Sequence, residues 1–233
     1  MAWVRSVLGR FLTGAKGIAF ELDSEIPYRE LAERVLPQAI AIARGLVRLR
    51  TRTFLGRGVT IRSRRRLTLG RYVKIGAGSE LDCLSRDGVI FGHGVSVGRY
   101  GAIRISGLRE LGQGVRLGDF VGIGDHFYLG GFGGIEIGAE TIIGERFTVH
   151  SDNHSFDDPD KAIRAQGTTP EPVVIGPRCW IGSNVTVLGG VEIGADSVIG
   201  AGAVVTRSFP VGSVIAGNPA RLFRNRLKQD NDG

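Results

Sequence analysis

The chain has 233 residues and a formal net charge of +7; 42% of its residues are hydrophobic and only 7% are aromatic. A chain of this length fits one repeat domain with end caps. No run approaches the roughly 20 apolar residues of a membrane span, and no secretory signal is apparent. Cys179 comes two residues before a position expected to face inward, so a buried free thiol is expected. We therefore expect a cytoplasmic protein.

Residues 1–54 lack a short repeat and are expected to form a basic helical cap or leader. Residues 28–50 predict a helix with Leu31, Val35, Ile42 and Leu46 near one face. Pro37 is expected to kink or break that helix. A helix at this place would close the open end of the repeats that follow. The alternative is an amphipathic helix lying on a bilayer.

Basic residues are concentrated in the same part of the chain. The first 74 residues hold 16 Lys/Arg against 5 Asp/Glu, and residues 44–74 hold eleven basic residues and no acidic one. This run is either a solvated face of the cap or a contact with an anionic partner, such as the inner face of a membrane or a lipid phosphate. No helix-turn-helix pattern or aromatic reading surface is present, so nucleic acid is not expected as a partner.

A six-residue repeat of aliphatic side chains occupies most of residues 55–217. Its most regular stretch comprises Ile175, Ile181, Val187, Ile193, Ile199, Val205 and Val211, and earlier blocks begin at Leu69, Phe91, Leu111 and Ile137. This period fits neither a helix nor a plain alternating strand. It predicts an all-β solenoid in which each aliphatic residue points inward and three hexads form a coil of about 18 residues. Residues 218–233 would form a cap and tail, with a short basic helix from Pro219.

The repeat is interrupted by a loop insertion over residues 150–173. The insertion is polar, acidic and proline-bearing, and loops of this length on rigid scaffolds tend to carry function. His150 and His154 lie at its root, and position 154 should face outward, where an imidazole has no core role. Trp180 also precedes an inward residue. It should either pack against the loop or another subunit, or form a wall for substrate or cofactor.

Three sequence motifs accompany the hexads and the histidine at the loop root: WIGSNV at 180–185, VIGAGAVVT at 198–206 and AGNPARLFR at 216–224. Together these features resemble the hexapeptide-repeat O-acetyltransferases, which include galactoside, maltose and bacterial surface-polysaccharide acetyltransferases. The resemblance covers roughly residues 55–226. It implies a left-handed parallel β-helix that works as a homotrimer, with each active site built by two chains.

The resemblance also implies direct transfer of an acetyl group from acetyl-CoA to a saccharide hydroxyl, with no metal. His154 matches the general base of the family, and Asp152 would orient its ring. Backbone N–H groups near residues 180–183 would stabilise the oxyanion. Residues matching the coenzyme A contacts are Trp180, Ser183, Ala201, Thr206, Arg221 and Arg224. Candidates for binding the acceptor are Asp125, His126 and Tyr128.

The basic N-terminal segment resembles the leaders of acetyltransferases that act in polysaccharide or lipopolysaccharide assembly. We therefore expect a saccharide acceptor, free or on a lipid-phosphate carrier. A xenobiotic, antibiotic or small-sugar acetyltransferase and a longer acyl donor remain alternatives. Outside this class, the alternatives are a zinc enzyme of the γ-carbonic anhydrase type using His126, His150 and His154, or a solenoid scaffold without catalysis.

Overall fold

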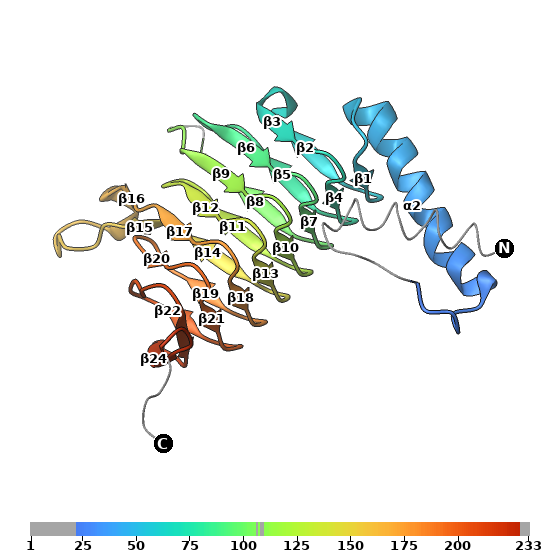
Figure 1. Ribbon diagram of the computed structural model, residues 1–233. Helices are drawn as coiled ribbons and strands as arrows, with labels where there is room; N and C mark the ends of the chain where they lie inside the picture. Colours follow the sequence, from blue (N-terminus) through green and yellow to red (C-terminus); the bar gives the residue numbers. More distant parts are fainter. Residues whose placement is uncertain (1–21, 106, 108–109, 229–233) are drawn as a thin grey trace, which may run out of the picture.

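A computed structural model describes residues 22–105, 107 and 110–228. Helix α2 (Tyr28–Leu49) lies beside the first coil of a three-faced parallel β-solenoid, whose coils follow one another toward the C-terminal end (Figure 1). The expected N-terminal leader before residue 22 lies outside the described residues. Among those described, no helix is both long and apolar enough to cross a bilayer.

Each face of the solenoid is one sheet, and we call the three faces A, B and C. Sheet A contains, in spatial order, β1 (Phe54–Leu55), β4 (Lys74–Ile75), β7 (Ser96–Val97), β10 (Gly122–Ile123), β13 (Ile142–Ile143), β18 (Trp180–Ile181), β21 (Val198–Ile199), β23 (Ser213–Ala216) and β24 (Arg221–Asn225). Sheet B contains β2 (Thr60–Arg62), β5 (Glu80–Asp82), β8 (Ala102–Arg104), β11 (Tyr128–Gly130), β14 (Thr148–His150), β19 (Thr186–Val187) and β22 (Val204–Val205). Sheet C contains β3 (Leu67–Leu69), β6 (Gly88–Phe91), β9 (Gly114–Leu117), β12 (Ile135–Ile137), β17 (Val173–Ile175) and β20 (Glu192–Ile193).

Four further elements of the described residues lie outside these faces. The 3₁₀ turn η1 (Arg64–Arg66) joins β2 to β3. Within the insertion, β15 (Asp152–His154) pairs antiparallel with β16 (Thr168–Pro170), and the 3₁₀ turn η2 (Ile163–Ala165) lies between them. Figure 1 shows this β15–β16 hairpin projecting from the side of the solenoid.

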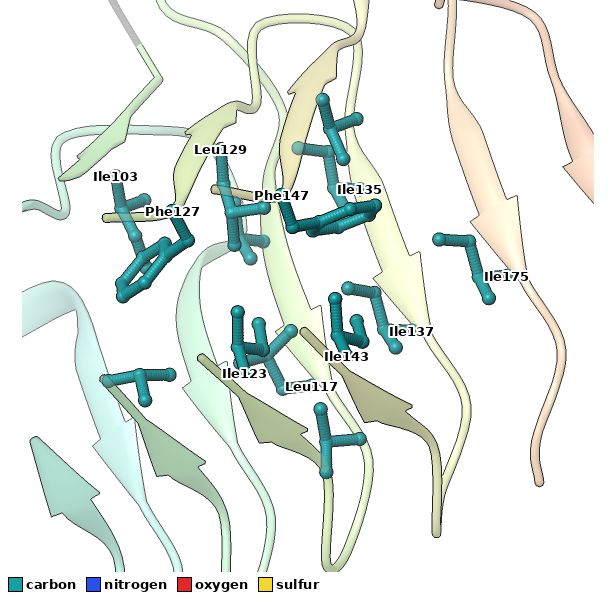
Figure 2. Packing of buried hydrophobic residues seen from close by; sticks show 14 of the residues in the cluster. Ile103, Leu117, Ile123, Phe127, Leu129, Ile135, Ile137, Ile143, Phe147 and Ile175 are labelled. Atoms are coloured by element: carbon teal, nitrogen blue, oxygen red, sulfur yellow. The ribbon is translucent and has the colours of Figure 1, made fainter. Parts of the chain in front are cut away.

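The six-residue repeat forms the core. Leu117, Ile137 and Ile175 are in register on three successive coils of sheet C and are each at most 1% exposed. Figure 2 shows these side chains stacked along the inside of the prism, with Ile103 and Leu129 forming a second stack. Because each coil covers the apolar interior of the next, the hexad positions form one continuous core. The predicted parallel β-helix is confirmed.

The register departs from the prediction at two positions. Leu111 is 39% exposed and Val211 is 50% exposed, so neither faces inward. In the last coil, Phe209 and Ile215 are buried instead, because the chain shortens its spacing after Val205. The coil length also varies. Trp180 and Val198 pair 18 residues apart, whereas Phe54 and Lys74 pair 20 residues apart.

The glycine after an inward residue is required by close stacking of the corners. A Cβ on Gly98 would lie 2.4 Å from the backbone of Gly124, and a Cβ on Gly124 would lie 2.6 Å from the backbone N of Glu145. Left-handed backbone occurs two residues further along each corner, where side chains are tolerated, as at His126 with φ 60°. The corner glycines therefore allow successive coils to approach closely.

Helix α2 caps the N-terminal end of the solenoid, as predicted. Leu31, Ala41, Gly45 and Leu49 are buried on its inner side. Arg44 Nη1 donates to the carbonyl of Leu55, and Arg48 Nη1 donates to that of Val59 at 3.1 Å. These guanidinium groups satisfy carbonyls at the edge of the first coil, where no preceding coil is available.

The break expected at Pro37 does not occur, because Pro37 lies on the exposed side of a continuous α2; the alternative of a kink stays a prediction. The short C-terminal helix expected from Pro219 is instead strand β24, which pairs antiparallel with β23. Strand β23 is the last of the parallel strands in sheet A, and β24 satisfies its open edge.

Candidate functional site

The insertion is anchored where sheet B turns into sheet C. Ser151 is fully buried at this corner; its Oγ donates to the Gly130 carbonyl at 2.7 Å and accepts from the Gly133 N–H at 2.9 Å. The Ser151 carbonyl accepts from the N–H of Glu171, at the far end of the insertion, at 2.8 Å. Both ends of the insertion are therefore fixed to the rigid coil.

His154 is an exposed residue at the end of β15. Its cross-strand partner is Thr168 on β16, whose Oγ1 lies 3.4 Å from His154 Nδ1. Asp152, which was predicted to orient the ring, makes no hydrogen bond to His154 in the described structure. The contact that does reach the ring comes from Thr168. Sequence reasoning missed Thr168 because nothing in the polar insertion indicated an antiparallel pairing.

A second contact holds the hairpin against the solenoid. Asn153 Nδ2 donates to Glu171 Oε2, and the Glu171 carboxylate lies over Gly189 on the next coil. A Cβ on Gly189 would lie 2.7 Å from Glu171 Oε2, so the absence of a side chain there makes room for this carboxylate. The position of Asn153, next to His154, is thus tied to the solenoid.

The three acceptor candidates lie one coil before the insertion, but they divide into two groups. Tyr128 points outward from sheet B and tilts against His150, with ring centroids 5.4 Å apart. Asp125 and His126 occupy the corner between sheets A and B. His126 stacks on Tyr100 at 5.5 Å. Of the three, Tyr128 has the position nearest in the fold to the root of the hairpin.

Asp125 is engaged in a structural ion pair. Arg99 donates from Nε at 2.9 Å and from Nη2 at 2.7 Å to Asp125 Oδ2, and its backbone N–H donates to Oδ1 at 2.7 Å. The hydrogen bonds from the Arg99 side chain, followed by the one from its backbone, hold the pKa of Asp125 below its usual value. This pair links two successive corners.

The predicted coenzyme A residues lie along sheet A and its edge with sheet B, except Thr206, which lies at the corner of sheets B and C. Trp180 is 61% exposed on β18, between Ile142 and Val198 in register. Ser183 lies at the corner that follows, where its Oγ donates to Glu145 Oε2 at 3.0 Å. The remaining residues occupy the adjoining coils: Ala201 is at the next corner, Thr206 follows β22, and Arg221 and Arg224 are on β24.

One chain does not bring Trp180, Arg221 or Arg224 to His154. The hairpin leaves at the corner between sheets B and C, which is opposite sheet A in a three-faced prism, whereas Trp180 and both arginines belong to sheet A. The interpretation that Trp180 packs against the loop of its own chain is therefore wrong. The other two interpretations of Trp180 are that it contacts another subunit and that it forms a wall for a ligand. Both stay predictions.

Both cysteines are buried free thiols. Burial raises the pKa of Cys83 to about 12, with a smaller contribution from the neighbouring Asp82 carboxylate, and burial also raises the pKa of Cys179. A raised pKa disfavours the thiolate, which is the nucleophilic form. Neither cysteine is therefore suited to form a covalent acyl intermediate.

The described residues contain no cluster of three or more His, Cys, Asp or Glu side chains arranged to hold a metal ion. The three histidines considered for a zinc site come from different places within one chain. His126 is at a corner of sheets A and B, His150 ends β14, and His154 is on the projecting hairpin.

Comparison with known proteins identifies relatives of this chain. Residues 172–207 match the family model described as bacterial transferase hexapeptide (six repeats). The chain is 33% identical over 137 residues to "Putative colanic acid biosynthesis acetyltransferase WcaF" of Escherichia coli (strain K12), which covers 59% of this chain and 72% of the relative. It is 34% identical to "Probable acetyltransferase Rv3034c" of Mycobacterium tuberculosis, over 86% of this chain and 57% of the relative.

A third relative and one solved structure are also named as acyltransferases. "Putative lipopolysaccharide biosynthesis O-acetyl transferase WbbJ" of Escherichia coli (strain K12) is 34% identical over 50% of this chain and 64% of its own length. A variant of AntD, an N-acyltransferase from Bacillus cereus, solved with dTDP and coenzyme A, has a TM-score of 0.50 and 17% identity, covering 79% of this chain and 89% of that one. The AntD likeness supports the fold.

Proposed function

This chain belongs to the hexapeptide-repeat acetyltransferases, and from that premise we propose that it transfers the acetyl group of acetyl-CoA to a saccharide hydroxyl in surface-polysaccharide or lipopolysaccharide assembly. The observation that carries the mechanism is the exposed imidazole of His154 on a hairpin fixed at both ends to the solenoid. Two relatives, WcaF and WbbJ, are named for colanic acid and lipopolysaccharide biosynthesis, which supports this class of acceptor.

His154 acts as the general base in this proposal. If Nδ1–H donates to Thr168 Oγ1, the neutral ring keeps a free lone pair on Nε2. Nε2 removes the proton of the acceptor hydroxyl as its oxygen attacks the thioester carbonyl. The tetrahedral intermediate then collapses, the C–S bond breaks, and the imidazolium returns the proton to the departing coenzyme A thiolate. The raised pKa values of both cysteines support direct transfer without an acyl-enzyme.

The oxyanion requires an N–H donor that the coil does not already use. The N–H groups of Trp180 and Gly182 donate to Ser197 and Ile199 of the next coil, at 2.9 and 2.8 Å. The Ser183 N–H donates to no described residue, so we assign it to the oxyanion. Arg221 and Arg224 would hold the phosphates of the coenzyme, for which guanidinium groups are suited by their paired donors.

We propose that the complete site forms between two chains of a homotrimer. Within one chain, Trp180, Arg221 and Arg224 lie on sheet A, opposite the corner that carries the hairpin with His154. Sheet A also presents an apolar row formed by Ile142, which is 64% exposed, Trp180 and Val198. A contact that places this row of one chain beside the hairpin of another would cover the apolar surface and bring the two halves of the site together.

A screen with labelled acetyl-CoA tests the function directly. Free oligosaccharides, lipid-linked glycans, small sugars and antibiotics are offered as acceptors, and the acetylated hydroxyl is identified by NMR. We expect acetylation of a glycan, free or lipid-linked. Transfer only to an antibiotic or small sugar would favour the alternative within the family. Failure to bind acetyl-CoA would favour a scaffold, whereas stoichiometric bound zinc with hydratase activity would favour the carbonic anhydrase type.

A further inference from the structure

The N-terminal end of the solenoid contains a cavity that the acetyl-transfer reaction does not use. Its volume is about 560 Å³, within the usual range for ligand pockets. The cavity lies between the end of α2, the η1 turn and β3, at the end of the prism shown beside α2 in Figure 1. It is lined by Leu49, Thr51, Arg64, Arg65, Leu67 and Leu69.

The apolar floor of this cavity exists because α2 covers the first coil incompletely. Helix α2 packs against β1, and Leu55 is fully buried. Leu67 and Leu69 on β3 remain partly exposed, whereas Val89 and Phe91, their partners in register on β6, are buried. Among the described residues, two core positions of the first coil are thus only partly covered at the sheet C side of the cap.

The rim of the cavity is cationic. Arg64 Nη1 donates to the Arg48 carbonyl at the end of α2, which holds Arg64 at the edge of the cavity. Arg65 is exposed and makes no hydrogen bond or ion pair with any described residue. Asp82 and Asp87 lie on the neighbouring coil at this corner, and neither forms an ion pair with Arg64 or Arg65 in the described structure. An apolar floor beneath a cationic rim is complementary to an anionic headgroup attached to a hydrocarbon chain.

We propose that this cavity binds an anionic membrane lipid, with its phosphate at Arg64 and Arg65 and the start of an acyl chain against Leu67 and Leu69. The site is separate from the acetyl-transfer site. Strand β3 is four strand steps from β17 in sheet C, or about 19 Å at the usual spacing between strands. Lipid binding would anchor the capped end of the solenoid to a membrane and can be tested without any turnover.

The test is sedimentation of the full chain with vesicles of phosphatidylglycerol and phosphatidylcholine, compared with phosphatidylcholine alone. We expect binding only to the anionic vesicles. Arg65→Ala removes a rim cation, and Arg57→Ala is a charge-matched control on an exposed position outside the cavity. Loss of a cation that only adds to surface attraction reduces binding by about fivefold. We expect Arg65→Ala to reduce it by clearly more than Arg57→Ala does.

A charge-neutral variant separates cavity binding from general attraction. Thr51→Trp places a large side chain at the cavity wall and should weaken vesicle binding, while circular dichroism melting and acetyl-CoA binding show that the fold and the other site are retained. Unchanged binding by Thr51→Trp, or equal losses for Arg65→Ala and Arg57→Ala, would overturn the proposal. Displacement of the vesicles by inorganic phosphate, with chloride at matched ionic strength as the control, would assign the cavity to a free anion.

Discussion

Thr168 and His154 face each other across the β15–β16 hairpin, with Thr168 Oγ1 3.4 Å from His154 Nδ1. This pairing gives the exposed imidazole a hydroxyl partner that restricts its rotation, and either atom can be the donor. The orienting group is a hydroxyl on the opposite strand, and the distance leaves room for the contact to tighten when substrates bind.

We predict that Thr168→Val lowers kcat by about tenfold, the effect of losing one hydrogen bond of about 1.4 kcal/mol to the base. KM for acetyl-CoA should stay unchanged, and Thr168→Ser should restore most of kcat because it keeps the hydroxyl. The measurement is steady-state kinetics across pH. Equal kcat for the Val and wild-type chains would remove Thr168 as a positioning residue.

We predict that replacing Arg221 and Arg224 together by alanine raises KM for acetyl-CoA by about tenfold or more, because charge-assisted contacts to phosphate are lost. The change in kcat should be smaller, since these contacts are far from the reacting thioester. Arg116→Ala, an exposed arginine on β9, is the control. A dominant fall in kcat with unchanged KM would contradict the assignment.

We predict that Asp125→Asn lowers Tm near neutral pH and that this difference disappears in acid. The hydrogen bonds from Arg99 depress the pKa of Asp125 in the folded chain, so the pair stabilises the fold above the unfolded-state pKa of about 3.9. That stabilisation is lost as pH falls through the lower folded-state pKa. Thermal unfolding of the wild-type and Asp125→Asn chains at several pH values measures the difference in Tm. A difference that persists at the lowest pH would contradict the predicted pH dependence.

We predict that Gly124→Ala destabilises the solenoid by about 1–3 kcal/mol, because its Cβ would meet the backbone of the next coil. Gly122→Ala is the matched control. Gly122 is on β10, two residues before Gly124, and a Cβ there meets no atom within 4 Å. Denaturant unfolding of the two variants measures the difference. Comparable stability would show that corner stacking is looser than the structure indicates.

The hexad predicted the solenoid because its inward residues are set by a local period. Ile181, Val187 and Ile193 are buried as expected. The prediction failed where tertiary pairing overrides local pattern. Arg221–Asn225 looked like a basic helix, yet it forms β24 because the open edge of β23 requires a partner. The prediction that Val211 faces inward was wrong because the last coil shortens its spacing.

The candidate site was predictable only in part. The interruption of the hexad located His154, but the partner of its ring depends on the antiparallel pairing of two strands inside a polar insertion. The contact of Glu171 with Asn153 likewise depends on the space above Gly189, which belongs to another coil. Residue roles that rest on the family resemblance, including those of Asp152, Ala201 and Thr206, stay predictions.

The most direct test of the central claim compares wild-type and His154→Ala chains in the transfer of labelled acetyl from acetyl-CoA to the acceptor found by the screen, with His93→Asn as a control histidine at a corner of the solenoid. We predict that His154→Ala lowers kcat by about 10²–10⁴, with unchanged acetyl-CoA affinity and assembly. A kcat equal to that of the wild-type chain would contradict the account.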